Sequence, residues 1–190
     1  MRSRFRFITF ILLLSLPPLG CGILYTGENM LVGKLSAILL TTDDVPTMKL
    51  DPVVTGHRRG VVKYPPVLAG FEQSWNGTRP EELIYVNYWL FQSVRDAQKA
   101  ADVWRSFIAA AAIEVNGRIE SAYQPELNPE DVIGDATWRV AGAPEIWFVK
   151  NNVLVYIIGR RSQVDQRQLT RAVARKIEAK INAALPKNTD

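Results

Sequence analysis

The chain of 190 residues carries one cysteine and one histidine, Cys21 and His57, which narrowly limits the chemistry it can perform. A single cysteine excludes an intramolecular disulfide framework and a cysteine-rich zinc site. A single histidine excludes a multi-histidine metal centre and the histidine-based zinc protease motif. No glycine-rich phosphate loop is present in the sequence. We therefore expect no bound metal and no cofactor.

His57 and the acidic side chains are the candidates for acid–base catalysis. His57 lies in the polar stretch 55–60 (TGHRRG), where it could act as a general base or contact an anion. An exposed loop histidine is the simpler interpretation. Adjacent carboxylates could serve glycoside hydrolysis or calcium binding, and three pairs occur: Asp43-Asp44, Glu81-Glu82 and Glu130-Asp131. Solvated turns and helix starts explain these pairs, because the sequence has no EF-hand spacing, so we assign no catalytic residue.

The tryptophans are the most suggestive side chains for binding. Trp89, Trp104 and Trp147 fall in strongly periodic segments, and we expect them to pack between elements of the core. Trp75 precedes the turn signal Asn76-Gly77, and Trp138 follows another polar stretch. We hypothesise that Trp75 or Trp138 is exposed and contacts a sugar or a partner protein.

Basic residues are concentrated at the two ends of the chain. Three arginines precede residue 7, and segment 159–190 has eight Lys or Arg against three Asp or Glu. The intervening segment 22–158 has twelve basic residues against sixteen acidic ones. The basic final segment could present a face for an anionic partner, with Arg167, Arg171 and Arg175 as candidate contacts. The alternative is that these arginines form the solvated face of a terminal helix.

The first residues have the pattern of an export signal. Residues 1–6 (MRSRFR) are basic, and residues 7–16 (FITFILLLSL) are apolar except for Thr9 and Ser15. Ten helical residues span about 15 Å, half of a hydrocarbon core of about 30 Å. The segment is thus too short for an ordinary membrane-spanning helix and matches a secretory signal.

The end of this signal, Leu19-Gly20-Cys21, resembles the lipobox of bacterial lipoproteins, although Pro18 stands where Leu is usual. The resemblance implies cleavage before Cys21, lipidation of Cys21 with palmitate among its acyl chains, and anchoring in the cell membrane or outer membrane. In lipoproteins of bacteria with two membranes, an Asp directly after the lipidated Cys commonly holds the protein at the inner membrane. Residue 22 is Gly and not Asp, which favours the outer membrane. Two alternatives stay open: an ordinary signal peptidase could cleave at Gly20-Cys21-Gly22, or the segment could remain as an uncleaved anchor.

We divide the chain into a signal peptide (1–20), a tether (21–35) and a single domain (36–190). In the first part of the domain we expect a short helix over 29–40 and a turn over 41–46. Short strands are expected at 53–54, 61–64 and 67–71, followed by a turn at Asn76-Gly77.

The pattern is clearer from residue 83 onward. Residues 83–91 (LIYVNYWLF) are apolar on both faces, which is typical of a central strand covered on both sides. A capping signal at 93–96 starts a helix of about 22 residues, which we expect Asn116-Gly117 to close. The remaining expectations are a surface connection over 118–133, a strand over 136–140, a hairpin of 145–150 and 153–158 around Asn151-Asn152, and a second helix from a capping signal at 162–165 to residue 185.

This order predicts an α+β fold, in which two long helices pack on an antiparallel sheet. The hydrophobic fraction of 47% and charged fraction of 22% fit a folded domain. Two stretches, 38–46 (ILLTTDDVP) and 148–156 (FVKNNVLVY), resemble the Mog1/PsbP-like arrangement found in small bacterial lipoprotein and sensor domains. That resemblance implies a fold and not a function.

Our leading hypothesis is a lipid-anchored cell-envelope protein of non-enzymatic type that binds a partner or ligand. Its partners would be the membrane, through the anchor, and an envelope protein or glycan; an exported protein makes nucleic acid an unsuitable partner. One alternative is an envelope enzyme whose site is assembled from distant carboxylates and His57. The other is an assembly factor of an envelope complex that uses the basic final helix.

The anchor hypothesis predicts that Cys21→Ala abolishes lipid labelling and releases the protein from the membrane fraction, because the thiol is the acylation site. Metabolic labelling with a fatty-acid analogue and fractionation would measure both effects. Gly22→Ala is the matched control and should keep the label. Labelling that survives Cys21→Ala would contradict lipidation at this residue.

Overall fold

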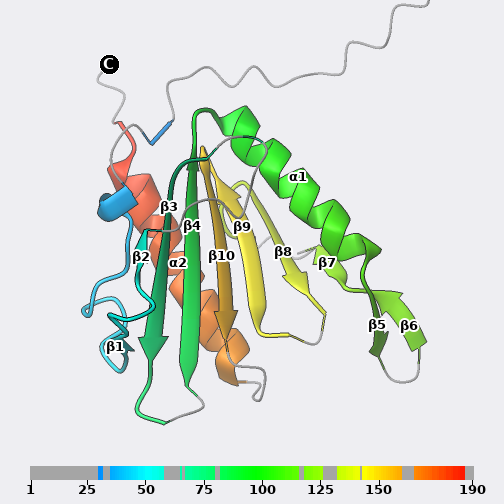
Figure 1. Cartoon of the computed structure of the whole chain (residues 1–190), viewed down its shortest axis with the longest axis horizontal. Helices are drawn as coiled ribbons and strands as arrows, with labels where there is room; N and C mark the ends of the chain where they lie inside the picture. Colours follow the sequence, from blue (N-terminus) through cyan, green and yellow to red (C-terminus); the bar gives the residue numbers. More distant parts are fainter. Residues whose placement is uncertain are drawn as a thin grey trace, which may run out of the picture.

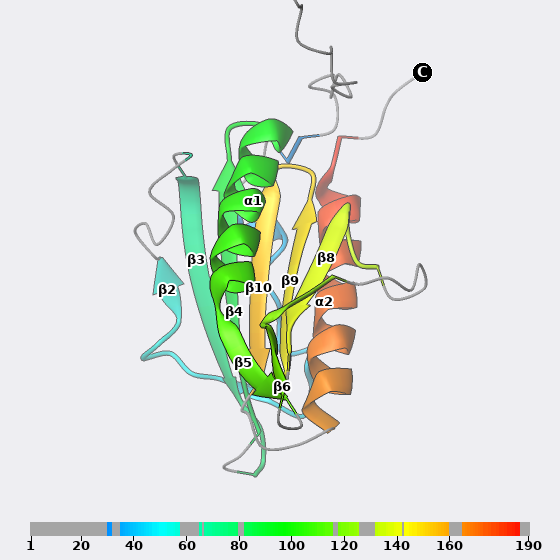
Figure 2. The ribbon, with the colours of Figure 1, turned by 90° about the vertical axis from the view of Figure 1, so that its right-hand side faces the viewer.

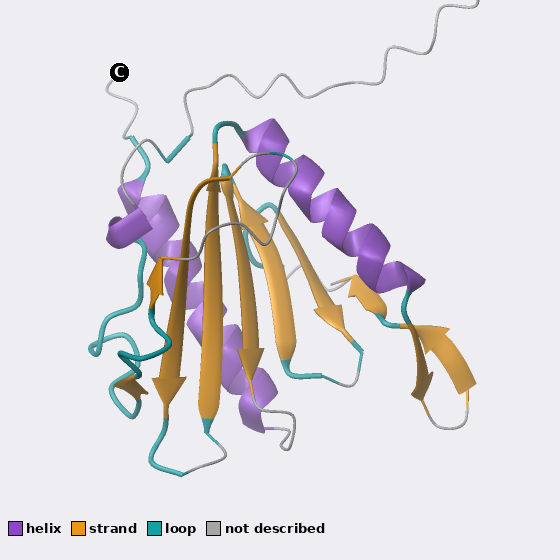
Figure 3. Cartoon of the chain, viewed as in Figure 1, coloured by secondary structure: helices purple, strands orange, loops and turns teal. Residues whose placement is uncertain are grey.

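The computed structural model describes residues 30–31, 35–57, 65, 67–79, 82–115, 118–125, 132–141, 143–159 and 165–186. These residues form an antiparallel sheet with one long helix on each face (Figures 1 and 3). In chain order the elements are a single 3-10 turn at Leu35–Ala37, β1 (Lys49–Leu50), β2 (Gly56–His57), β3 (Val67–Asn76), β4 (Leu83–Phe91), α1 (Val94–Ala110), β5 (Ala112–Val115), β6 (Arg118–Ser121), β7 (Tyr123–Pro125), β8 (Ala136–Val140), β9 (Glu145–Lys150), β10 (Val153–Gly159) and α2 (Asp165–Ala184).

The main sheet has the strand order β1-β3-β4-β10-β9-β8-β7, with β2 also paired to β3. Every strand pair in it is antiparallel. The predicted α+β fold with two long helices on an antiparallel sheet is therefore confirmed. The predicted strand at 67–71 extends to Asn76, and the turn signal Asn76-Gly77 does lie between β3 and β4.

Alternate residues of the central strands face two separate cores, as the sequence predicted for β4. In β4, Ile84, Val86 and Tyr88 pack toward α2, whereas Trp89 and Phe91 pack toward α1. The strands β9 and β10 alternate in the same way, and Figure 2 shows the two helices on opposite sides of the strands. Since successive strand side chains point to opposite faces, a strand that is apolar at every position needs both covers.

Helix α1 is shorter than its sequence suggested. Ser93 caps its start, since the Ser93 Oγ accepts a hydrogen bond of 3.1 Å from the Asp96 backbone N–H. The helix ends at Ala110, and residues 112–115 instead form β5, which pairs with β6 in a hairpin beside the main sheet (Figure 3). The prediction of a 22-residue helix was wrong because a short apolar run fits either period, and pairing with β6 decides it. Residues 116–117 lie outside the described part.

Three further expectations need correction. The interval 118–133 is not only a surface connection, because it contains β6 and β7. Residues 53–54 lie in a turn and not in a strand, and the Val53 side chain is 90% exposed. The helix expected over 29–40 is reduced to the 3-10 turn at Leu35–Ala37 within its described residues. The expected strand at 61–64 and the capping residues 162–164 lie outside the described residues.

The hairpin of β9 and β10 is confirmed, with Asn151 and Asn152 as its two turn residues. Asn151 has a φ of 52°, a left-handed conformation that asparagine tolerates. The carboxylate of Asp135 holds this turn, accepting from the Asn151 backbone N–H at 2.6 Å and pairing with Lys150 Nζ at 2.9 Å. The turn chemistry thus sets the register of the two most buried strands.

Two buried amide side chains attach the part of the chain before β1, described at residues 30–31 and 35–48 and called the N-terminal segment below, to the sheet. The Asn152 side chain accepts from the Leu31 N–H at 2.7 Å and donates to the Leu31 and Phe91 carbonyls at 3.2 and 2.9 Å. Gln73 accepts from the Leu40 N–H and donates to the Leu40 carbonyl, both at 3.0 Å. Each amide therefore pairs with both backbone groups of one residue, as a neighbouring strand would. Among the described residues, Leu31 and Leu35 already belong to the core, although they precede the domain start predicted at residue 36.

An ion pair joins the same segment to α2. Asp44 Oδ2 accepts from the Thr41 backbone N–H at 2.8 Å and lies 2.9 Å from Lys180 Nζ. Burial alone would raise the pKa of Asp44, but the hydrogen bonds from Lys180 and Thr41 outweigh it and lower the pKa below its usual value. Asp44 is therefore charged at neutral pH and ties the turn to the helix.

Asn152→Ala should destabilise the domain by about 2 to 4 kcal/mol, because it leaves buried backbone groups of Leu31 and Phe91 without partners. Urea unfolding would measure the loss. The matched control is the neighbouring Asn151→Gly, which suits the positive φ and should leave stability nearly unchanged. Equal stability of the two variants would contradict the role given to Asn152.

Asp44→Asn should lower the free energy of unfolding at pH 7, and the difference from the parent protein should shrink as the pH falls below 4. Because the pKa of Asp44 is lowered in the folded state, its contribution is present above the unfolded pKa and is lost as the carboxylate protonates. Urea unfolding between pH 3 and pH 7 checks this. A difference that stays constant over that range would argue against the ion pair.

Candidate functional site

Two of the residues considered from the sequence cannot be placed. Cys21 lies outside the described residues, so its lipidation stays a prediction. His57 ends β2, where its backbone is in register with Phe71 of β3, but its side chain and the adjacent residues 58–60 lie outside the described part. The hypothesis of a site around His57 is therefore untested.

The exposure predicted for Trp75 and Trp138 is wrong. Trp75 is 1% exposed and Trp138 is 0% exposed, so neither indole is presented to a partner in this structure. Trp75 lies in β3 with its side chain in the core under α2, and Trp138 lies in β8 with its side chain under α1. Nearness to a turn in the sequence did not give exposure, because strand alternation directs both side chains inward.

The aromatic side chains under α1 form a single stack. The ring centroid of Trp147 in β9 lies 6.0 Å from the centroids of both Trp89 and Trp138, and the rings are nearly parallel, at 8° and 11°. The centroid of Tyr156 lies 4.1 Å from that of Trp147. Trp104 of α1 covers Trp147 at 5.0 Å. The core position predicted for Trp89 and Trp147 is confirmed, while Trp104 is half-buried against the same cluster. These tryptophans hold α1 on the sheet.

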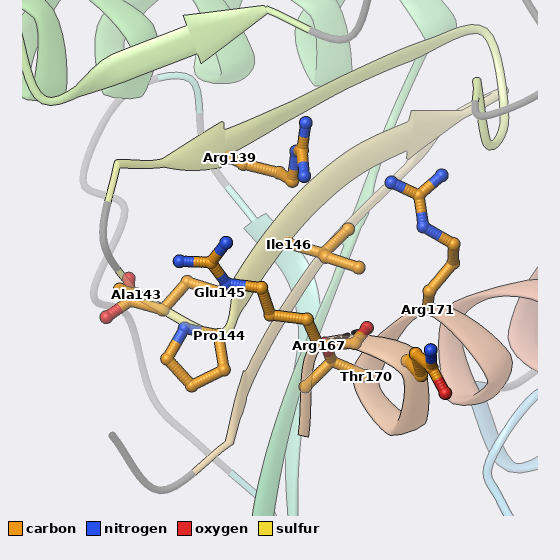
Figure 4. A pocket seen from close by; sticks show the side chains of 9 residues that line it. Arg139, Ala143, Pro144, Glu145, Ile146, Arg167, Thr170 and Arg171 are labelled. Carbon is orange, nitrogen blue, oxygen red and sulfur yellow. Dashed lines mark hydrogen bonds between the residues drawn. The ribbon is translucent and has the colours of Figure 1, made fainter. Parts of the chain in front are cut away.

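The other face of the sheet carries a small pocket where α2 begins. The pocket has a volume of about 110 Å³, and residues of β8, β9, their connection and the first two turns of α2 line it (Figure 4). Its lining consists of Arg139, Ala143, Pro144, Glu145, Ile146, Arg167, Gln168, Thr170 and Arg171. Three arginines therefore meet at one opening.

Strand and helix periodicity place these arginines together. Trp138 faces α1, so its neighbour Arg139 faces α2. Arg167 and Arg171 are four residues apart and so share one face of α2. In Figure 4, Arg139 and Arg171 reach toward each other above Ile146, and Arg167 extends over the start of β9. The pocket is thus assembled from segments that the β9–β10 hairpin separates in the chain.

The charge of the lining is predominantly positive. Glu145 is its one carboxylate and is 8% exposed; its Oε2 accepts a hydrogen bond of 3.0 Å from the Tyr156 hydroxyl. Arg139, Arg171 and Glu145 also interact with other groups of the protein, so an incoming anion would share or replace these contacts. Guanidinium groups suit carboxylate and phosphate oxygens, which makes this an anion-binding geometry.

The functional groups of the lining are three guanidinium groups, one carboxylate, one amide and one threonine hydroxyl. None of the nine lining residues is a serine, cysteine, histidine or lysine. The hydroxyl of Thr170 donates to the Arg167 backbone carbonyl at 3.0 Å and is buried. Within the described residues, no group of three or more histidine, cysteine or acidic side chains could hold a metal ion.

The three arginines singled out from the sequence are separated by the structure. Arg167 and Arg171 line the pocket, whereas Arg175 pairs with Glu178 at 3.0 Å. Glu178 also accepts from the Gly134 backbone N–H at 2.7 Å, so this pair fastens α2 to the turn before β8. The sequence analysis did not single out Arg139. The one local signal was its position as a charged residue between the apolar Trp138 and Val140 of the predicted strand.

No protein-family model matches the chain, and no curated protein sequence matches it. Among solved structures it is similar to the extracellular domain of PknH from Mycobacterium tuberculosis, with a TM-score of 0.44 and 14% sequence identity. That similarity covers 78% of this chain and 94% of the other. A similarity at this level carries no argument about function. In the part of the chain that the structure describes, none of the helices is long and apolar enough to cross a membrane.

Proposed function

We propose that the protein is a lipid-anchored cell-envelope protein of non-enzymatic type, and that its ligand or partner binds in the arginine pocket. The observation that carries this proposal is that Arg139 from β8 and Arg167 and Arg171 from α2 line one pocket. Three guanidinium groups and one carboxylate line this pocket, so its charge favours an anionic ligand.

Export and anchoring are supported by the sequence. The basic start, the short apolar segment 7–16 and the lone Cys21 directly after it form the pattern of a lipoprotein signal. Two or more acyl chains on Cys21 would hold the domain stably at the cell membrane or the outer membrane. The partner would then be an envelope protein or glycan that carries negative charge, and not nucleic acid.

The assembly-factor hypothesis is compatible with the same pocket. A partner protein with an exposed carboxylate or other anionic group would use the arginines in the same way as a small ligand. On this hypothesis the contact would involve Arg167 and Arg171, which line the pocket, and not Arg175, which lies outside its lining. A binding protein and an assembly factor therefore share one test.

Reversing the pocket charge with Arg167→Glu and Arg171→Glu together should reduce partner recovery from crosslinked envelope fractions at least about tenfold, because charged hydrogen bonds are lost and repulsion is introduced. Lys176→Glu, at an exposed position of α2 outside the lining, is the control. It makes the same charge change as either single variant, Arg167→Glu or Arg171→Glu, and these are measured beside it. Quantitative mass spectrometry of the captured proteins and glycans would measure recovery. Equal recovery for the pocket variant and the control would rule out the pocket as the contact site.

A further inference from the structure

The pocket's size limits what part of a ligand it can enclose. Sites that bury a whole small molecule typically measure about 300 to 1,000 Å³, whereas this pocket measures about 110 Å³. It therefore has room for one anionic group of a ligand and leaves the remainder of that ligand outside. Recognition would depend on the chemistry of that group.

The number and origin of the arginines favour phosphate over carboxylate. One guanidinium can satisfy both oxygens of a carboxylate through two parallel hydrogen bonds. A phosphate monoester presents three acceptor oxygens in a tetrahedral arrangement and carries about −1.5 to −2 charges near neutral pH. Arg139 reaches the pocket from β8, while Arg167 and Arg171 reach it from successive turns of α2. Three donors with different directions match a tetrahedral group better than a planar one.

The pocket also lies at a defined end of the domain. The N-terminal segment joins the sheet at the turn between β9 and β10, where Asn152 binds Leu31. The pocket lies at the other end of this hairpin, around Pro144 and Glu145 at the start of β9. A six-residue strand such as β9 spans about 20 Å. In Figure 1, α2 starts at the lower end of the sheet and ends at its upper end.

This placement puts the pocket at the end of the domain away from the point where the N-terminal segment joins the sheet. Cys21 precedes Leu31 by ten residues, which reach at most about 35 Å when fully extended. That reach exceeds the length of β9, so an anchor at Cys21 does not by itself keep the pocket away from the lipid. A membrane headgroup and a soluble ester are therefore distinguished by experiment.

We propose that the arginine pocket binds the phosphate group of a water-soluble phosphate monoester at the end of the domain away from the point where the N-terminal segment joins the sheet. This inference rests on the proposed function, because both the use of the pocket and the anchor at Cys21 belong to it. It adds the chemical class of the ligand and the end of the domain at which the ligand binds.

The test is a calorimetric titration of the full-length, lipid-bearing protein in neutral detergent with glycerol 1-phosphate, inorganic phosphate and succinate. We expect saturable binding of glycerol 1-phosphate and no binding of succinate at the same concentration. Arg167→Gln and Arg171→Gln should each raise the Kd at least about tenfold, and Lys176→Gln should leave it unchanged. Unaltered urea unfolding curves would show that these variants fold.

A second titration locates the source of the phosphate group. The protein is anchored in neutral phosphatidylcholine vesicles or in vesicles that also contain phosphatidylglycerol, and glycerol 1-phosphate is added to each. We expect the same Kd in both. Loss of binding only in the phosphatidylglycerol vesicles would overturn the proposal, since lipid headgroups would then occupy the pocket. Succinate binding as tight as that of the ester, or inorganic phosphate bound with the ester excluded, would overturn it as well.

Failure here can be separated from failure of the proposed function. If glycerol 1-phosphate does not bind but Arg167→Glu with Arg171→Glu still abolishes partner recovery, the pocket is a contact site for another anion and the phosphate assignment is wrong. If neither experiment responds to the pocket variants, the proposed function is wrong too.

Discussion

The structure depends on one constraint: its three central strands are apolar on both faces. Each of β4, β9 and β10 therefore requires a cover above and below, and a single helix cannot supply both. Helix α1 covers one face through small alanines and the stacked tryptophans around Trp147. Helix α2 covers the other, but it leaves a margin that the N-terminal segment must fill with Leu31, Ile38 and Leu40. The three-layer arrangement follows from this requirement.

Burying Leu31 and Leu40, which lie outside the helices and strands, creates a second requirement, because their backbone groups lose water and need partners. Asn152 and Gln73 meet it by imitating a neighbouring strand at Leu31 and Leu40. Tyr88 adds a hydrogen bond of 2.8 Å to Gln73, and burial keeps this phenol protonated by raising its pKa. The domain is thereby closed at the end where its N-terminal segment enters, and the polar pocket is left at the other end, where α2 starts beside the first residues of β9.

How far the sequence predicted this arrangement depends on the range of each interaction. Asn151-Asn152, the two apolar faces of 83–91 and the apolar stripe of α2 are local signals, and each led to the correct element. Residues 112–115 were misjudged because pairing with the adjacent strand β6, and not their own apolar pattern, selects a strand. Trp138 was misjudged because the direction of its side chain depends on the pairing of β8 with β7 and β9 and on the cover by α1. The same holds for Arg139, whose meeting with Arg167 and Arg171 no sequence spacing indicates.

By itself the sequence determined the export pattern ending at Cys21, the α+β class and the principal hairpin and helices, because periodicity and turn chemistry act over a few residues. It also limited the chemistry, through its single histidine and single cysteine. Only the tertiary structure decided which of the suggested contact residues meet and which are buried. In the folded chain Trp75 and Trp138 lie in the two cores, and Arg175 pairs with Glu178. Arg167 and Arg171 line one pocket together with Arg139. The physical reason is that a binding site is a relation between side chains in space, which depends on how α2 crosses the sheet.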